Sequence, residues 1–184
     1  MNARRMVFFG LAALMALLPI VGIPEFWITQ LNYIGLFAIV ALGLVLLTGV
    51  SGLTSFGQAA FVGLGAYTSA YLTTAHGMSP WLTIFVALAI TIAVSLALAA
   101  VTLRMSGHYL PLATIAWGLS LYYTMSNMEF LGKYDGILGV PAMEFFGLSL
   151  ASGRAYFYLI WVVALLAAVA VIHLLDSRTG RAIR

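Results

Sequence analysis

The side chains able to do acid–base or nucleophilic chemistry are almost absent from the long apolar runs of this sequence. No run has Asp, Glu, Lys or Arg in its interior, and the three histidines, His76, His108 and His173, lie near run ends. A charge at the centre of a membrane span costs at least about 2.5–3.5 kcal/mol, so membrane enzymes and proton carriers keep such groups for function. The chain also has no cysteine and no P-loop. We therefore expect no enzymatic activity, no ATP hydrolysis by this chain, no cofactor and no metal site.

Uncharged hydroxyl, amide and glycine residues gather instead between Gly49 and Ala70, where Gln58 is the only carboxamide. Its two donors and one acceptor could line a path for a zwitterionic solute. They could equally make an interhelical hydrogen bond, typically worth about 0.6 kcal/mol. Both uses of Gln58 stay open from the residues alone.

The same stretch carries small residues at every fourth position, as in Ser55, Ala59 and Gly63, the pattern by which membrane helices pack closely. Residues 48–58 are too polar for a lipid-facing helix and have no charge for an ordinary loop. One interpretation is a broken or re-entrant element beside a translocation path. The other is a cytoplasmic turn over residues 49–57 followed by a tightly packed helix.

The elements that must position this stretch are membrane helices. Hydrophobic residues make up 64% of the 184 residues and charged ones 7%, against about 25% charged in soluble domains, and the mean hydropathy is +1.10. The apolar runs are too long and too unalternating for barrel strands. We predict an all-α polytopic fold in one transmembrane domain, with spans over residues 6–23, 28–47, 58–74, 81–103, 109–125 and 156–175. The first run could also be a signal peptide, although it lacks a clean cleavage site.

The cations predict the orientation of these six spans. With the N-terminus inside, six cations fall in the cytoplasm and only Lys133 and Arg154 fall outside; the six are Arg4, Arg5, Arg104, Arg178, Arg181 and Arg184. The positive-inside rule favours this arrangement. We expect both termini to be cytoplasmic.

Residues 52–67 read Gly-Leu-Thr-Ser-Phe-Gly-Gln-Ala-Ala-Phe-Val-Gly-Leu-Gly-Ala-Tyr. This resembles the Gly-Leu-x-Ser-x-Gly-Gln/His-Ala-Ala-Phe-x-Gly-x-Gly-Ala-Tyr signature of branched-chain amino acid ABC transporter permeases, in particular of the M-type permease subunit. The resemblance implies a translocation path beside the signature positions, which here are Gly52, Ser55, Gly57, Gln58, Gly63, Gly65 and Tyr67.

Two further stretches are similar to segments of that family. Residues 103–116 resemble the segment leading into its fifth span, and residues 133–141 resemble an external Gly/Asn-rich loop. In the loop Gly136, Gly139 and Pro141 match, whereas Lys133 and Asp135 stand where the family usually has glycine and asparagine. These residues would make a stiff turn outside the membrane, either for docking of a soluble binding protein or as a plain connector.

The C-terminal residues 177–184 resemble the opening of the cytoplasmic segment through which such permeases contact their ATPase. The resemblance assigns ATPase coupling to Ser177, Arg178, Gly180 and Arg181. In the family this segment runs on into further spans, so we expect this chain to be the N-terminal part of a permease.

The resemblance implies a transmembrane subunit of an ABC importer for branched-chain or related amino acids in a bacterial inner membrane. The implied partners are a second permease subunit, cytoplasmic ATP-binding subunits and a periplasmic amino-acid-binding protein, with no nucleic acid. Two alternatives stay open. One is a permease of the same family for urea or another small amide, and the other is a non-transporting membrane scaffold built on small-residue packing.

Overall fold

The computed structural model describes residues 10, 15, 17–102, 104–105, 109–145 and 148–183. The first predicted span, residues 6–23, and the predicted motif at residues 103–116 therefore lie partly outside the described residues. The chain divides into two compact units. One contains Met1–Ser51 together with Glu144–Arg184, and the other contains Gly52–Met143.

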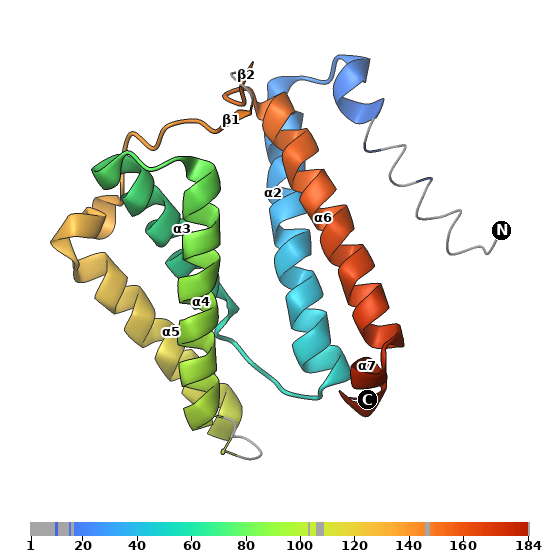
Figure 1. Ribbon diagram of the computed structural model, residues 1–184, viewed down its shortest axis with the longest axis vertical. Helices are drawn as coiled ribbons and strands as arrows, with labels where there is room; N and C mark the ends of the chain where they lie inside the picture. The colour runs from blue at the N-terminus through green and yellow to red at the C-terminus, as the bar shows by residue number, and fades with distance from the viewer. Residues whose placement is uncertain are drawn as a thin grey trace. The chain divides into compact units, whose positions relative to one another are not determined.

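The first unit is built on two long helices, α2 (Glu25–Leu44) and α6 (Gly153–Asp176), which pack side by side (Figure 1). The short elements around them are η1 (Leu18–Val21), the π-helical turn η2 (Val45–Val50), α7 (Arg178–Ile183) and an antiparallel ribbon of β1 (Glu144–Phe145) and β2 (Leu148–Ser149). Helix α6 begins at Ser152, whose hydroxyl accepts a hydrogen bond from the Ala155 N–H at 3.2 Å.

Polar contacts hold the N-terminal ends of α2 and α6 together. The Asn32 amide donates to the Gly153 carbonyl at 2.9 Å, and the Arg154 guanidinium donates to the Ile23 carbonyl at 3.2 Å. Arg154 also lies 3.2 Å from the Glu25 carboxylate, although both side chains are partly exposed. Such bonds between helices fix which faces meet.

Glycine allows the two backbones to approach further along this contact. A Cβ at the buried Gly35 of α2 would lie 2.7 Å from Ile160 Cγ2 of α6, closer than real side chains come. Two turns earlier in α2, Ile28 is fully buried, as is Phe157 of α6. The interface is thus a dry apolar seam closed at one end by polar groups.

The second unit contains α3 (Gln58–His76), α4 (Pro80–Thr102) and α5 (Tyr109–Asn127), followed by the 3-10 turns η3 (Glu129–Leu131) and η4 (Lys133–Asp135). Helix α3 ends at Gly77, which has a φ of +60°, and Pro80 opens α4. This turn returns the chain so that α3 and α4 form a tight hairpin (Figure 1).

Three hydroxyl groups join α3 to α4, and two of the residues that carry them, Thr73 and Thr83, are buried. Ser69 Oγ lies 2.9 Å from Thr83 Oγ1, and Thr73 Oγ1 donates to the Ser69 carbonyl at 2.6 Å. Thr83, which has no exposed surface, also donates to the Pro80 carbonyl at 2.9 Å. Because each hydroxyl has a hydrogen-bond partner, the cluster stabilises the contact between the two helices.

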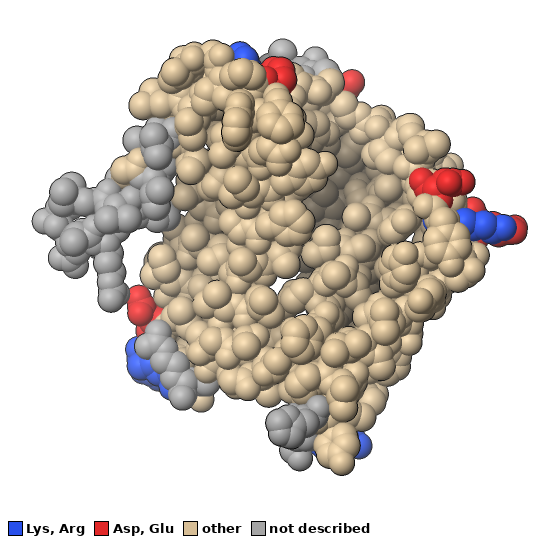
Figure 2. All heavy atoms as spheres, turned by 180° about the vertical axis from the view of Figure 1, so that it is seen from behind, with Lys and Arg blue, Asp and Glu red and all other residues tan. Residues whose placement is uncertain are grey.

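Three helices in the described part of the chain are long and apolar enough to cross a membrane: Glu25–Val50, Pro80–Thr102 and Gly153–Asp176. Most of the surface visible in Figure 2 is uncharged. The predicted helical membrane class is therefore confirmed. Helices α3 and α5 cover the other two predicted ranges described here but are less apolar, and six crossings stay a prediction.

The helical chain is interrupted before α3. After the π-helical turn η2, residues 51–57 are not helical, and Gly52 has a φ of +66°, a conformation that favours glycine. Single turns of π-helix are frequent at functional sites. The interruption coincides with the polar stretch singled out in the sequence, and its re-entrant form stays a prediction.

Candidate functional site

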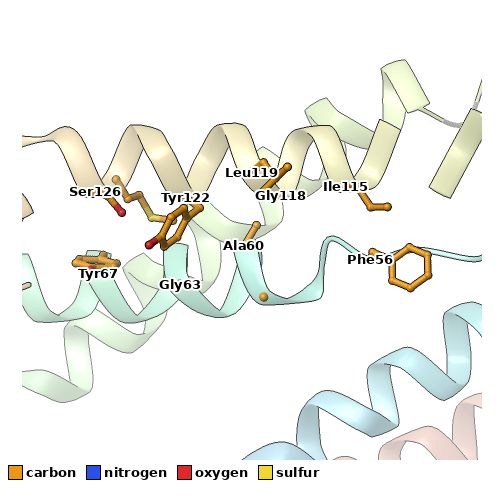
Figure 3. A pocket seen from close by; sticks show the side chains of 11 residues that line it. Phe56, Ala60, Gly63, Tyr67, Ile115, Gly118, Leu119, Tyr122 and Ser126 are labelled. Carbon is orange, nitrogen blue, oxygen red and sulfur yellow. The ribbon is translucent and has the colours of Figure 1, made fainter. Parts of the chain in front are cut away.

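A cavity of about 380 Å³ lies between α3 and α5, beside the interruption (Figure 3). Pockets that bind small molecules usually measure about 300–1,000 Å³. The cavity is lined by Phe56, Ala59, Ala60, Gly63 and Tyr67 on one side and by Ile115, Gly118, Leu119, Tyr122, Met125 and Ser126 on the other.

The two ends of this α3–α5 cavity differ in polarity. Figure 3 places Tyr67 and Ser126 at one end, with Tyr122 beside them, and Ile115 and Phe56 at the other. None of the described residues that line the cavity carries a charge. An uncharged pocket with hydroxyls at one end suits a solute without net charge that has a polar part and an apolar part.

Two signature positions contribute directly to this cavity. Gly63 faces α5 so closely that a Cβ there would lie 3.3 Å from Met125 Cε. The Tyr67 hydroxyl reaches toward the loop after α5, where a Cβ at Gly136 would lie 3.8 Å away. Tyr67 and Met125 also line a second cavity, of about 350 Å³, between α3, α4 and α5.

The segment in front of α3 is fastened to α5. The Phe56 N–H donates to Thr114 Oγ1 at 3.1 Å, and the Gly57 N–H donates to Ser55 Oγ at 3.4 Å. Gly57 is buried, and a Cβ there would meet the Thr114 carbonyl at 3.6 Å. These contacts fix the cavity at its Phe56 end.

The remaining signature residues lie elsewhere. Gly52 and Ser55 belong to the non-helical segment, and Gln58 opens α3 without being among the residues that line the cavity. Gly65 faces α4, where a Cβ would lie 3.6 Å from Thr91 Oγ1. The small residues of α3 therefore serve two different helix contacts, one with α5 and one with α4.

The predicted external loop follows η3 in the same unit. Gly132, Gly136 and Gly139 all have positive φ, and a Cβ at Gly132 would overlap the Gly136 carbonyl. Lys133 also has a positive φ of +53°, at the position where the resemblance expects glycine. Leu131 is buried and the Phe130 ring lies 5.3 Å from that of Tyr71, so the loop is anchored to α3 while Leu138 is 82% exposed. Pro141, at the end of the loop, is exposed and lies outside any helix or strand.

The predicted coupling residues form a compact turn in the other unit. Ser177 separates α6 from α7, its hydroxyl accepts from the Gly180 N–H at 3.1 Å, and its carbonyl accepts from the Arg181 N–H at 3.1 Å. The Arg181 guanidinium donates to the Asp176 carbonyl at 2.7 Å. Gly180 is buried against the last turn of α6, where a Cβ would overlap the Leu174 carbonyl. Arg178 is exposed.

One wall of the cavity could not be predicted from the sequence. Signature residues predict the α3 side. On the α5 side, Gly118, Leu119 and Tyr122 lie outside every motif, and Ile115 lies within the 103–116 stretch but has no predicted role. Asn32 was not among the predicted site residues either. The signal for it is a carboxamide within a predicted span, which is typical of a hydrogen bond between helices.

Comparisons with known proteins agree on one family. The family described as branched-chain amino acid transport system, permease component, matches residues 26–184. The high-affinity branched-chain amino acid transport system permease proteins LivM of Salmonella typhimurium and Escherichia coli K12 are each 32% identical to this chain over 114 residues. Those matches cover 61% of this chain and 27% of each relative, so the matched part spans about a quarter of their length. No solved structure matches the chain.

Proposed function

Because the chain belongs to the family of branched-chain amino acid transport system permease components, we propose that it forms part of the path by which an ABC importer carries branched-chain amino acids across a bacterial inner membrane. The family comprises transport permeases, not enzymes, and its members are multi-pass membrane proteins. The observation that carries the proposal is the α3–α5 cavity, because the signature residues Gly63 and Tyr67 line it.

The composition of the cavity favours a branched-chain amino acid over urea or another small amide. Most of its lining is apolar, and its hydroxyl groups lie at one end. Urea has no apolar part to place against Ile115 and Leu119, whereas an aliphatic side chain gains free energy by leaving water there.

ATP hydrolysis by partner subunits would supply the free energy for transport. We place the cytoplasmic ATP-binding subunits at Ser177, Arg178, Gly180 and Arg181, because this turn is held rigidly on the end of α6. Movement of the ATPase pair would then be transmitted along α6, and a second permease subunit would complete the wall of the path. Coupling of this kind requires that both sites bias one shared two-state element.

We assign the loop with Gly136, Gly139 and Pro141 to the opposite, periplasmic side of the membrane. Its exposed apolar side chains, Tyr134, Leu138 and Val140, would contact a periplasmic amino-acid-binding protein. This assignment places both termini in the cytoplasm, as the distribution of arginines predicts.

The test is transport by the assembled importer. The chain is reconstituted in liposomes with its cognate second permease, ATP-binding subunits and binding protein, and uptake of radiolabelled leucine is measured with and without ATP. We expect ATP-dependent uptake that disappears when this chain is omitted, and competition by unlabelled isoleucine and valine but not by urea.

Two other results would redirect the assignment. Strong competition by urea together with weak competition by valine would favour a small-amide permease. An assembled complex that hydrolyses ATP but takes up no solute would favour a non-transporting scaffold.

A further inference from the structure

We propose that Gly118 of α5 sets the size of the solute side chain that the α3–α5 cavity accepts. This inference rests on the proposed function, and it names a specificity-determining residue that lies outside every sequence motif of the chain.

Gly118 has no packing reason to be glycine. Apart from its two chain neighbours and the nearby backbone of α5, no described residue has an atom within 4 Å of the position that its Cβ would occupy. Its φ is not positive, since the positive-φ glycines lie elsewhere. Glycine weakens a helix interior relative to alanine, and Gly118 lies in the middle of α5. What its missing side chain provides is space, because Gly118 lines the cavity.

The space beside Gly118 is at the apolar end. Figure 3 shows Gly118 and Leu119 facing Ala60 of α3, with Ile115 beyond them. Tyr122 follows Gly118 by four residues, a rise of about 6 Å along α5. Figure 3 shows it on the side of Tyr67 and Ser126.

An amino acid with an aliphatic side chain matches this gradient. Its polar end would lie near the hydroxyl groups, and its side chain would extend toward Gly118. The uncharged lining excludes acidic and basic side chains, because burying an unpaired charge is far more costly than burying a methyl group. The occupant we assign is therefore a neutral amino acid with a branched aliphatic side chain.

The test narrows the cavity at this one position. Gly118→Ala and Gly118→Val are introduced into the assembled importer, and kcat/KM for uptake is measured for leucine, valine and alanine. One methylene in an apolar pocket is worth about 10–200-fold in discrimination. We expect Gly118→Val to lower leucine uptake about 10-fold or more relative to alanine uptake, and Gly118→Ala to have a smaller effect in the same direction.

Two further variants keep the result interpretable. Gly43→Ala is the matched control, because Gly43 lies in α2, its Cβ position is also open and it lines neither cavity. Leu119→Ala widens the apolar end and should raise phenylalanine uptake relative to leucine. The same binding protein is used throughout, so its own preference cancels between variants.

The outcomes separate the two proposals. If the unmodified importer takes up no branched-chain amino acid, the proposed function fails and this inference falls with it. If the unmodified importer transports leucine but neither Gly118→Val nor Leu119→Ala changes the ratio between solutes, the side chain does not occupy this space and only the inference is overturned. An equal loss for all solutes in every Gly118 variant, with normal assembly, also overturns it.

Discussion

Gly180 packs so closely against the end of α6 that any side chain at this position would collide with the α6 backbone. A Cβ there would lie 2.7 Å from Leu175 Cα and 2.8 Å from the Leu175 carbonyl oxygen. Backbone atoms cannot turn away as a flexible side chain can, so α7 keeps its position only with glycine at residue 180.

We predict that Gly180→Ala either destabilises the protein by about 1–3 kcal/mol, the usual cost of overpacking, or releases α7. Limited trypsin digestion followed by mass spectrometry detects the release as faster cleavage at Arg178 and Arg181. The control is Ala182→Gly, which changes the exposed side of the same helix. Unchanged stability together with unchanged cleavage would contradict the packing described for this turn.

The backbone of Lys133 is strained in a way that its neighbours are not. A left-handed conformation costs a residue other than glycine roughly 1–2 kcal/mol. The compensating pair with Glu129, at 2.7 Å, is largely exposed and is worth only about 0.2–1 kcal/mol.

We therefore predict that Lys133→Gly is more stable than Lys133→Ala by about 1 kcal/mol, measured as thermal unfolding of the detergent-purified protein. Both variants lose the ion pair, so the difference between them isolates the backbone term. Equal unfolding temperatures would show that the φ of +53° carries no cost here.

At the scale of the elements, a cluster of hydroxyl groups lies at the contact between α3 and α4. Thr83 sits at the centre of the cluster, between Ser69 and Thr73. Thr83→Val keeps the shape of the side chain and removes its hydrogen bonds. We expect a loss of about 0.6 kcal/mol, and at most about 1.7 kcal/mol, the range measured for hydrogen bonds between membrane helices.

Thr74→Val is the matched control for this prediction. The Thr74 hydroxyl donates to the Ala70 carbonyl of its own helix, and the residue is exposed. Thermal unfolding of the two variants side by side should therefore show a change only for Thr83→Val. A similar change in both would mean that hydroxyls stabilise α3 itself and not its contact with α4.

Most helices were predictable from the sequence because each is a long apolar run, and the runs end at Gly77, Pro80 and Ser152, which stop or start helices by known chemistry. The start of α6 was placed at Tyr156 instead of Gly153, because Arg154 looked like a loop residue. In the structure the Arg154 guanidinium donates a hydrogen bond to the Ile23 carbonyl, next to the start of α2. That contact joins residues 131 positions apart, which no local pattern reveals.

The candidate site was half predictable for a similar reason. Glycine spacing marked Gly63 and Gly65 as contact positions, and both face a neighbouring helix. It could not show that they face different helices, because that depends on where α4 and α5 lie around α3. The role of Gly118 could not be predicted from the sequence, since an isolated glycine in an apolar run belongs to no motif. Only the structure shows the open space beside it.

At the scale of the whole molecule, the predicted topology has six crossings with both termini in the cytoplasm. The chain has no cysteine, so single cysteines can report the side of the membrane. Suitable positions are Met78 in the α3–α4 turn, Leu138 in the exposed loop and Ala182 in α7. Gly132 is unsuitable, because a side chain there would overlap Gly136.

We expect a membrane-impermeant thiol reagent added outside the cell to label positions 78 and 138 and to spare position 182. Position 182 should react only after the membrane is permeabilised. Labelling of Ala182→Cys from outside, or failure of both outer positions to label in intact cells, would reject the topology.

The pairing of α2 with α6 has a consequence for synthesis on the ribosome. Asn32 and the carbonyl of Gly153 to which it donates are 121 residues apart, and the entire second unit is encoded between them. At ~5–20 residues per second, α2 emerges roughly 6–24 s before its partner helix exists. Throughout that interval the Asn32 amide and the Glu25 carboxylate must be accommodated by lipid head groups, water or the insertion machinery. Completion of the first unit therefore waits for translation of the second, and nascent chains halted before Gly153 should retain α2 in an unpaired state.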